Sequence, residues 1–350
     1  MKKLAIILFI TILTFAMAAC SEDTSSQEDD ASGENKESAL QIHTTVYPLQ
    51  YFTEQIAGDA VEVETILPPG TDPHTYEPTT KEMVNMAEAD AFIYNGAGLE
   101  GYAQKISDSL KPEDVKVLEA AKGIDLEEQG HTHGEDSTEA EHSDEHAHED
   151  EDHADEEDST SHEGEEQSDH EGHDHGENDP HVWLDPIRSI QLAENIKEML
   201  IELKPEKEEQ FNQNFEKLKQ KLTDLDHQFH EQLENKPKNE IIVSHAAYGY
   251  WEQAYGIEQI AVSGLSPSNE PSQKELENII ETAEAHDLNH VLFEQNVTPK
   301  VAEVVQSEIG AEPLRIHNLS VLTEEDIQDD ENYISLMKQN LEKLNQALSE

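Results

Sequence analysis

A histidine-rich, acidic segment is the part of this chain whose residue types most plainly predict metal chemistry. No lysine or arginine occurs between Lys122 and Arg188, and few residues in that gap are apolar. Neutral imidazole is the commonest protein ligand for zinc, copper and nickel, and dense carboxylates raise the local concentration of cations. An acidic run alone is ordinarily a solvated tail or loop, but ten histidines favour metal binding over that alternative. These histidines are His131, His133, His142, His146, His148, His153, His162, His170, His173 and His175.

The same composition predicts disorder. Such a segment cannot bury enough apolar surface to offset the entropy lost on ordering the chain. We therefore expect residues 129–178 to form a disordered His/Asp/Glu-rich segment. Its metal sites should be weaker than a folded site, because the chain must be ordered around each ion.

Three further histidines stand outside this segment, each in a predicted loop. His74 lies in PPGTDPHTYEPT, His181 in NDPHVWLDP and His245 in IIVSHAAYGYW. In open α/β sheets, ligands bind at the carboxyl ends of the strands, so loops of this kind can converge on one cleft. A single loop histidine is more often a surface or hydrogen-bonded residue, and the long spacing alone leaves both interpretations open.

Alternating strands and helices must position these loops, and this alternation indicates parallel βαβ units. The predicted strands begin at Gln41, Val61, Ala91, Val115, Glu240, Gln259, His290 and Pro313. Helical periodicity predicts helices over residues 49–57, 81–89, 273–285, 299–309 and 333–348.

A sustained amphipathic stripe follows Pro205. A helix over this stretch would be about 45 Å long at a rise of about 1.5 Å per residue. A coiled-coil dimer is the alternative, but a mixed stripe of Phe and Leu favours a helix that lies along two lobes of one chain. The stripe consists of Phe211, Phe215, Leu218, Leu222, Leu225, Phe229 and Leu233.

Together these patterns predict an α/β protein of two parallel-sheet lobes joined by a long helix, with a metal site in the interlobe cleft. The expected N-terminal lobe covers residues 41–128, and the expected C-terminal lobe covers residues 239–350. The linking region with the long helix covers residues 179–238.

The first residues, MKKLAIILFITILTFAMAAC, have the pattern of a secretory signal. Their apolar run is shorter than the roughly 20 residues that span a membrane. Because MAAC resembles a bacterial lipobox, we expect a signal peptide at residues 1–19, lipidation of Cys20 and an acidic flexible tether over residues 20–40. The protein would then be anchored by lipid at the extracytoplasmic face of the cell membrane. A plain signal peptide with a chance cysteine is the alternative.

Composition excludes several classes of partner and ligand. A formal net charge of -57 argues against nucleic acid or anionic lipid as a partner of the folded body. Cys20 is the only cysteine, so a metal site in the folded body must consist of nitrogen and oxygen ligands. Cysteine-based structural zinc is thereby excluded, and a His-rich site that exchanges its ion is favoured.

The motifs PHTYEP, DPHVWLDP and SHAAYGYW occur in this order, with the His-rich insertion directly before the second. In this they resemble the zinc-binding lipoproteins of bacterial ABC importers, the cluster A-I solute-binding proteins. The resemblance covers essentially the whole chain. It implies two α/β lobes linked by a rigid long helix, with His74, His181 and His245 as zinc ligands. It also implies a monomeric binding protein rather than an enzyme. This protein would deliver zinc to a membrane permease driven by a cytoplasmic ATPase.

The proposed ligands favour zinc over manganese. Three imidazoles and one oxygen suit tetrahedral zinc, whereas manganese prefers more carboxylate. In manganese members of the family the third position is typically Glu, and this chain has His245 there. Binding of manganese or another divalent metal is the alternative within the class. A zinc-dependent hydrolase is the alternative outside it, although the chain lacks the HExxH motif.

The fourth ligand is left open by the sequence. Relatives often place Asp or Glu in the loop after the last strand, where this chain has Ser320 and Val321. Water, Glu324, Glu294 or a histidine of the His-rich segment could complete the shell. Glu294 could instead hydrogen-bond a ligand from outside the shell.

Overall fold

The computed structural model describes residues 39–126 and 178–349. The predicted signal peptide, Cys20, nearly all of the predicted tether and nearly all of the His-rich segment lie outside the described residues. Within those two ranges, no helix combines the length and the apolar character needed to span a membrane.

The N-terminal lobe is a parallel sheet with helices packed on it. Its strands are β1 (Leu40–Thr44), β2 (Val61–Thr65), β3 (Ala91–Tyr94) and β4 (Lys116–Glu119). Its helices are α1 (Tyr47–Ala57), α2 (Thr80–Ala87) and α3 (Ala103–Leu110). The strand order is β2-β1-β3-β4, and each neighbouring pair is parallel. The predicted βαβ units are therefore confirmed for this lobe.

The C-terminal lobe repeats the same sheet arrangement. Its strands are β5 (Glu240–His245), β6 (Glu258–Ser263), β7 (His290–Glu294) and β8 (Glu312–Ile316). Its helices are α6 (Gly249–Tyr255), α7 (Gln273–Ala285), α8 (Lys300–Ile309), α9 (Glu324–Gln328) and α10 (Tyr333–Ala347). The strand order is β6-β5-β7-β8, again parallel throughout. Ligand sites in such sheets lie where the order reverses, here at the carboxyl ends of β5 and β7.

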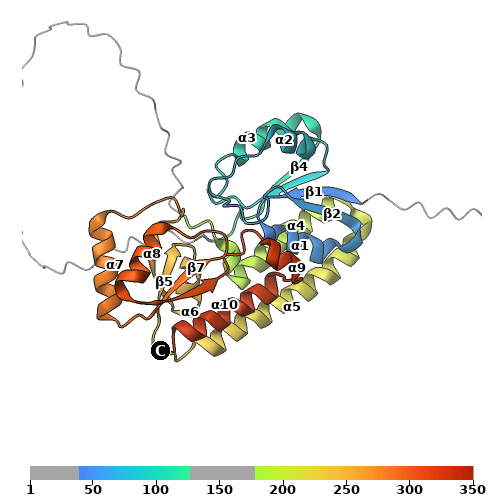
Figure 1. Cartoon of the computed structure of the whole chain (residues 1–350). Coiled ribbons are helices and arrows are strands. Elements are labelled where there is room, and N and C mark those ends of the chain that lie inside the picture. The colour runs from blue at the N-terminus through green and yellow to red at the C-terminus, as the bar shows by residue number, and fades with distance from the viewer. Residues whose placement is uncertain (1–38, 127–177, 350) are drawn as a thin grey trace, which may run out of the picture. The chain divides into compact units, whose positions relative to one another are not determined.

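Two long helices connect the lobes, α4 (Pro186–Leu203) and α5 (Glu208–Leu233). All seven apolar residues of the predicted stripe in α5 are buried. Helix α5 packs against α1 of the first lobe and α10 of the second, and it lies along both lobes in Figure 1. The predicted long connecting helix is thus confirmed, and the stripe is buried within one chain rather than in a coiled-coil seam.

The connecting helix is shorter than expected. Residues Pro205–Lys207 form a separate 3-10 turn, and the 26 residues of α5 span about 39 Å at about 1.5 Å per residue. Proline favours the first turn of a helix, but the backbone leaves the α-helical conformation at Lys207, where φ is -101° and ψ is 2°, so α5 begins only at Glu208. Helices α3, α6 and α9 were not expected. Helices α6 and α9 have only seven and five residues, too few to show a helical period.

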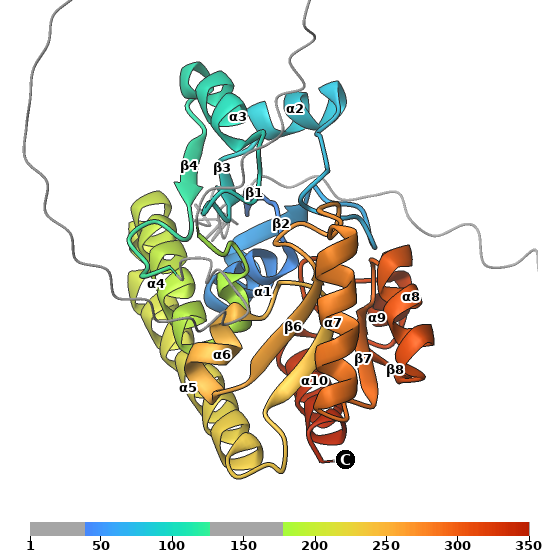
Figure 2. The ribbon, with the colours of Figure 1, turned by 90° about the vertical axis from the view of Figure 1, so that its left-hand side faces the viewer.

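Side chains alternate between the two faces of each sheet, as the pleat of a strand requires. In β3, Phe92 packs with residues of α2 and α3, whereas Ile93 joins a core shared with α1, α4, α5 and α10. In β5, Ile242 packs with residues of α7 and α8, whereas Val243 joins the shared core. Figure 2 shows α7 lying over the C-terminal sheet. Both sheets are therefore covered on both faces, so the loops at the strand ends, and not the faces of the sheets, are left to carry function.

Local signals set the helix ends. Thr79 and Ser272 each form a capping box with a glutamate three residues later, and Asp185 accepts two backbone N–H groups at the start of α4. Gly256 and Gly310 end α6 and α8 in the left-handed conformation that glycine adopts without strain.

Candidate metal centre

His74 is half-buried in the loop between β2 and α2. The backbone N–H of His74 donates to Asp72 Oδ1 at 3.0 Å, and the hydroxyl of Thr75 donates to Asp72 Oδ2 at 3.2 Å. An aspartate that accepts hydrogen bonds from the residues following it stabilises a tight turn. The DPH sequence therefore holds the His74 backbone in place after a strand end.

His181 is buried, with 2% of its surface exposed, and a second DPH sequence holds it. Asp179 Oδ1 accepts from the His181 backbone N–H at 2.9 Å and faces Nδ1 of the ring at 2.7 Å. The hydroxyl of Tyr250 donates to the Asp179 carbonyl at 2.7 Å, and Asn95 Nδ2 donates to the Pro180 carbonyl at 2.9 Å. Both lobes thus contribute hydrogen bonds to the loop of His181.

His245 is the last residue of β5, and it is buried beside the last residue of the neighbouring strand β7. Nδ1 of His245 lies 2.5 Å from Oε1 of Glu294. The hydroxyl of Tyr248 donates to Glu294 Oε1 at 3.2 Å, and Asn318 Nδ2 donates to Glu294 Oε2 at 2.9 Å. Burial and the negative charge of Glu294 raise the pKa of Tyr248 well above its ordinary value, so its hydroxyl keeps the proton that it donates.

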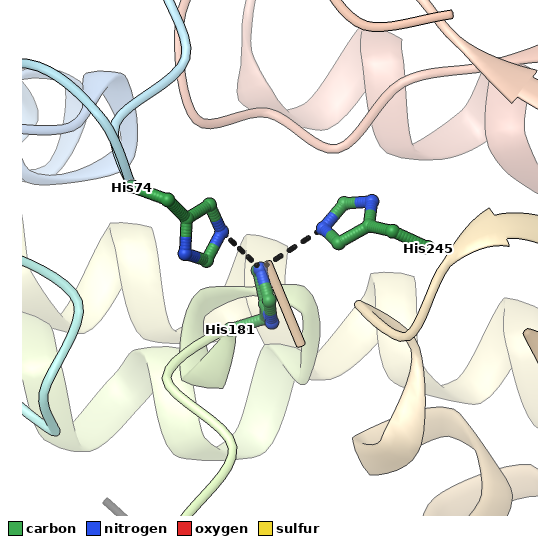
Figure 3. Close-up of side chains that lie close together, drawn as sticks. All are labelled: His74, His181 and His245. Carbon is green, nitrogen blue, oxygen red and sulfur yellow. Dashed lines mark hydrogen bonds between the residues drawn. The ribbon is translucent and has the colours of Figure 1, made fainter. Parts of the chain in front are cut away.

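The three histidines converge at one point (Figure 3). Nε2 of His181 lies 3.1 Å from Nε2 of His74 and 3.3 Å from Nε2 of His245. One ring nitrogen from each of the three lies within 4.8 Å of the others. Two ligands at about 2.0 to 2.1 Å from a tetrahedral zinc ion are separated by about 3.3 Å. The separations of His181 Nε2 from its two neighbours therefore match those of ligands on one small cation.

The tautomer of His181 points the same way. A carboxylate can only accept hydrogen bonds, so the contact of Asp179 with Nδ1 of the His181 ring favours a proton on that nitrogen. Nε2 of His181 then carries the lone pair that a neutral imidazole offers to a metal ion. Glu294 lies close to Nδ1 of His245 but without the alignment of a hydrogen bond.

The candidate fourth ligands do not join this group within the described residues. Glu294 contacts the opposite nitrogen of the His245 ring. Glu324 is exposed in the first turn of α9, and the hydroxyl of Ser320 donates to Asn318 Oδ1 at 2.8 Å. The histidines of the His-rich segment lie outside the described residues.

Asp179 is a functional residue that sequence reasoning missed. Its position two residues before His181, in the order Asp-Pro-His, repeats that of Asp72 before His74. This repetition is a local signal that could have identified it. Carboxylates that hold the second nitrogen of a metal-binding imidazole fix the orientation of its ring and raise its basicity.

The fold and the histidine cluster together define the class: a two-lobed α/β protein in which loops of both lobes bring three histidines together. Its family follows from comparison with known proteins. The chain belongs to the ZnuA family, described as "Zinc-uptake complex component A periplasmic", whose model matches residues 42–347. The resemblance seen in the three motifs is thereby confirmed.

Two relatives and one solved structure illustrate this membership. The zinc-binding lipoprotein AdcA of Streptococcus pneumoniae is 33% identical over 353 residues, which cover 99% of this chain and 61% of that protein. The chain thus spans less than two thirds of that relative. The high-affinity zinc uptake system protein ZnuA of Bacillus subtilis is 31% identical over 347 residues, covering 99% of this chain and 98% of the relative. The crystal structure of the Zn(II)-bound ZnuA-like domain of Streptococcus pneumoniae AdcA matches with a TM-score of 0.67 and 32% identity, over 89% of this chain and all of that one.

Proposed function

We propose that this protein is the extracytoplasmic zinc-binding component of an ABC-type zinc importer, and that His74, His181 and His245 are its zinc ligands. The observation that carries the proposal is the convergence of three Nε2 atoms from three distant loops, with neighbouring separations of 3.1 and 3.3 Å. The names of the relatives support zinc as the ion.

Charge balance supports a divalent cation at this position. Asp179 and Glu294 are both buried, with 3% and 0% of their surfaces exposed. When the imidazoles are neutral, the form that binds metal, two ionised buried carboxylates leave a net negative charge that is costly without a partner. One divalent ion at the three Nε2 atoms brings the formal sum to zero.

The ligand set supports zinc rather than manganese. All three ring nitrogens are the borderline-soft donors that zinc takes readily, whereas manganese favours oxygen ligands. The fourth position is then filled by water or by a ligand from outside the described residues.

A binding function fits the geometry better than hydrolysis. A zinc hydrolase needs a general base on the same side as the metal-bound water. The two carboxylates that contact these histidines, Asp179 and Glu294, lie at the Nδ1 atoms, on the far side of the rings from the converging Nε2 atoms. We therefore propose a binding protein and not an enzyme.

Delivery and anchoring complete the proposal. The family supports delivery to a membrane permease with a cytoplasmic ATPase, and the name lipoprotein of a relative supports lipidation of Cys20 and a location at the outer face of the cell membrane. We propose a monomeric carrier, with the His-rich segment as an accessory zone that collects zinc near the tighter site.

A competition titration tests the proposal. The full chain is titrated with zinc and with manganese against chelators of known affinity, alongside His181→Ala and the surface control His286→Ala. We expect one tight site, from which manganese does not displace zinc. That site should weaken more than about a hundredfold in His181→Ala, beyond the loss typical of outer partners, and stay unchanged in His286→Ala. Manganese outcompeting zinc, or a tight site unaffected by His181→Ala, would refute it.

A further inference from the structure

Asn318, in the loop after β8, is buried, with 4% of its surface exposed. Besides donating to Glu294, its Nδ2 atom donates to Asn296 Oδ1 at 3.1 Å, and its carbonyl accepts from Trp183 Nε1 at 2.8 Å. We propose that Asn318 is a positioning residue that joins the three loops carrying the histidines and so sets the zinc affinity of the site. This inference rests on the proposed zinc-binding function.

The first connection runs to His245. Asn318 Nδ2 donates to Glu294 Oε2 at 2.9 Å, and Glu294 Oε1 lies 2.5 Å from Nδ1 of His245. Because Asn318 and Tyr248 hold the two oxygens of Glu294, the carboxylate plane is fixed. The negative charge of Glu294 is thereby held beside Nδ1 of His245.

The second connection runs to His181. The indole of Trp183, two residues beyond His181, donates to the Asn318 carbonyl. The rings of Trp183 and His181 are in edge contact with centroids 5.4 Å apart. The loop of His181 is therefore tied to the loop of Asn318 beside the ligand itself.

The third connection runs to His74. Asn296, which accepts from Asn318, donates through Nδ2 to the Thr71 carbonyl at 3.2 Å. Thr71 lies in the turn that leads to His74. Asn318 thus reaches all three ligand loops through at most one intermediate side chain.

The orientation of the Asn318 amide is set by its partners. Oδ1 accepts from the backbone N–H of Ser320 at 3.1 Å, from the hydroxyl of Ser320 at 2.8 Å and from Gln295 Nε2 at 2.8 Å. With these donors on Oδ1, the NH2 group must face Glu294 and Asn296. Only an amide supplies an acceptor and two donors at this place, so no apolar or carboxylate side chain can replace it.

Asn340 offers a matched control. It is the same residue type, is buried with 1% exposed, and pins the same loop by accepting from the His317 N–H and donating to the His317 carbonyl, each at 2.8 Å. Within the described part of the chain, the hydrogen bonds of the Asn340 side chain join it to His317 and Met337, and none joins it to Glu294. Replacing Asn340 therefore loosens the loop without removing the donor to Glu294.

The experiment compares Asn318→Leu with Asn340→Leu in the full chain. Zinc affinity is measured by chelator competition, zinc–ligand distances by X-ray absorption, and melting temperature without metal. We expect Asn318→Leu to lose about tenfold to a hundredfold in zinc affinity and to show a wider spread of zinc–nitrogen distances. Asn340→Leu should lower the melting temperature but leave the affinity within about twofold. Equal affinity losses in the two variants, or an Asn318→Leu affinity equal to that of the unaltered chain, would overturn the proposal.

A double-mutant cycle tests the route. If Asn318 acts through Glu294, Asn318→Leu should weaken zinc binding much less in the Glu294→Gln background than in the unaltered chain. The reason is that the effects of substitutions within one network are not additive. Full additivity would overturn that route. If Asn318→Leu does not fold, Ser320→Ala serves instead, because it removes a donor to Asn318 Oδ1. We expect Ser320→Ala to weaken zinc binding severalfold. Unchanged zinc binding in Ser320→Ala would overturn the proposal. Failure of the zinc-binding function is seen separately, in the unaltered chain and in His181→Ala.

Discussion

Glu294 and His245 end the neighbouring parallel strands β7 and β5, and their side chains meet with Oε1 of the carboxylate 2.5 Å from Nδ1 of the imidazole. Both are almost fully buried. The sheet itself therefore places the carboxylate of Glu294 beside Nδ1 of His245, because strand pairing fixes the relative position of the two residues.

This pairing predicts the effect of Glu294→Gln. The neutral amide still fits the space but makes the imidazole a weaker base, so zinc affinity should fall by about tenfold to a hundredfold. Chelator competition measures the change. The matched control is Glu312→Gln on the exposed part of β8, which should bind zinc like the unaltered chain. An affinity gain in Glu294→Gln would contradict the role of the carboxylate.

Zinc binding should weaken in acid. Protons compete with zinc for imidazole nitrogens, and an unperturbed histidine side chain titrates at about pH 6.5. We expect the affinity to fall by more than about tenfold between pH 7 and pH 5, as measured with a chelator whose own pH dependence is known. An unchanged affinity at pH 5 is incompatible with three imidazole ligands.

Deleting most of the His-rich segment should distinguish its weak zinc sites from the tight site of the three converging histidines. Removing residues 129–176 should leave one tight zinc site per chain and remove the weaker sites, because the three converging histidines all lie outside that stretch. Isothermal titration calorimetry of the full and shortened chains gives both stoichiometries. Loss of the tight site on deletion would show that this site depends on residues 129–176, and it would contradict the assignment to the three converging histidines.

Asp326 predicts a stability change in acid. Burial raises the pKa of Asp326, but hydrogen bonds from His317 and Thr323 outweigh it and lower the pKa to about 2. A lowered carboxyl pKa stabilises the fold above the unfolded value of about 3.9, and this contribution is lost as the pH falls from about 4 towards 2. Because Asp326 is partly exposed, we expect it to contribute about 1 kcal/mol to the free energy of unfolding at neutral pH.

Urea unfolding of metal-free protein checks this with Asp326→Asn. The variant should be less stable than the unaltered chain at pH 6, and the difference should shrink as the pH falls to 3. A difference that is constant across this range would show that the carboxylate charge contributes nothing. Exposed Asp329, next to the end of α9, provides the control Asp329→Asn.

The sequence alone determined those features that depend on neighbours along the chain. The period of the Phe and Leu stripe predicted α5, and alternation of strands with helices predicted both parallel sheets, because helix and strand periodicity follow from backbone geometry. The three histidines were singled out because the motifs around them resemble those of a known family. The DPH turns at His74 and His181 are equally local, since Asp72 and Asp179 hydrogen-bond residues only two or three positions away.

Only the tertiary structure decided how these parts meet. The contact between His245 and Glu294 joins residues 49 positions apart through the pairing of β5 with β7, and no spacing rule predicts it. The connections of Asn318 to Trp183, Glu294 and Asn296 depend on the packing of both lobes against α4 and α5. Chain neighbours impose only short-range order, whereas the position of the three Nε2 atoms depends on the register of two sheets and the packing of a shared core.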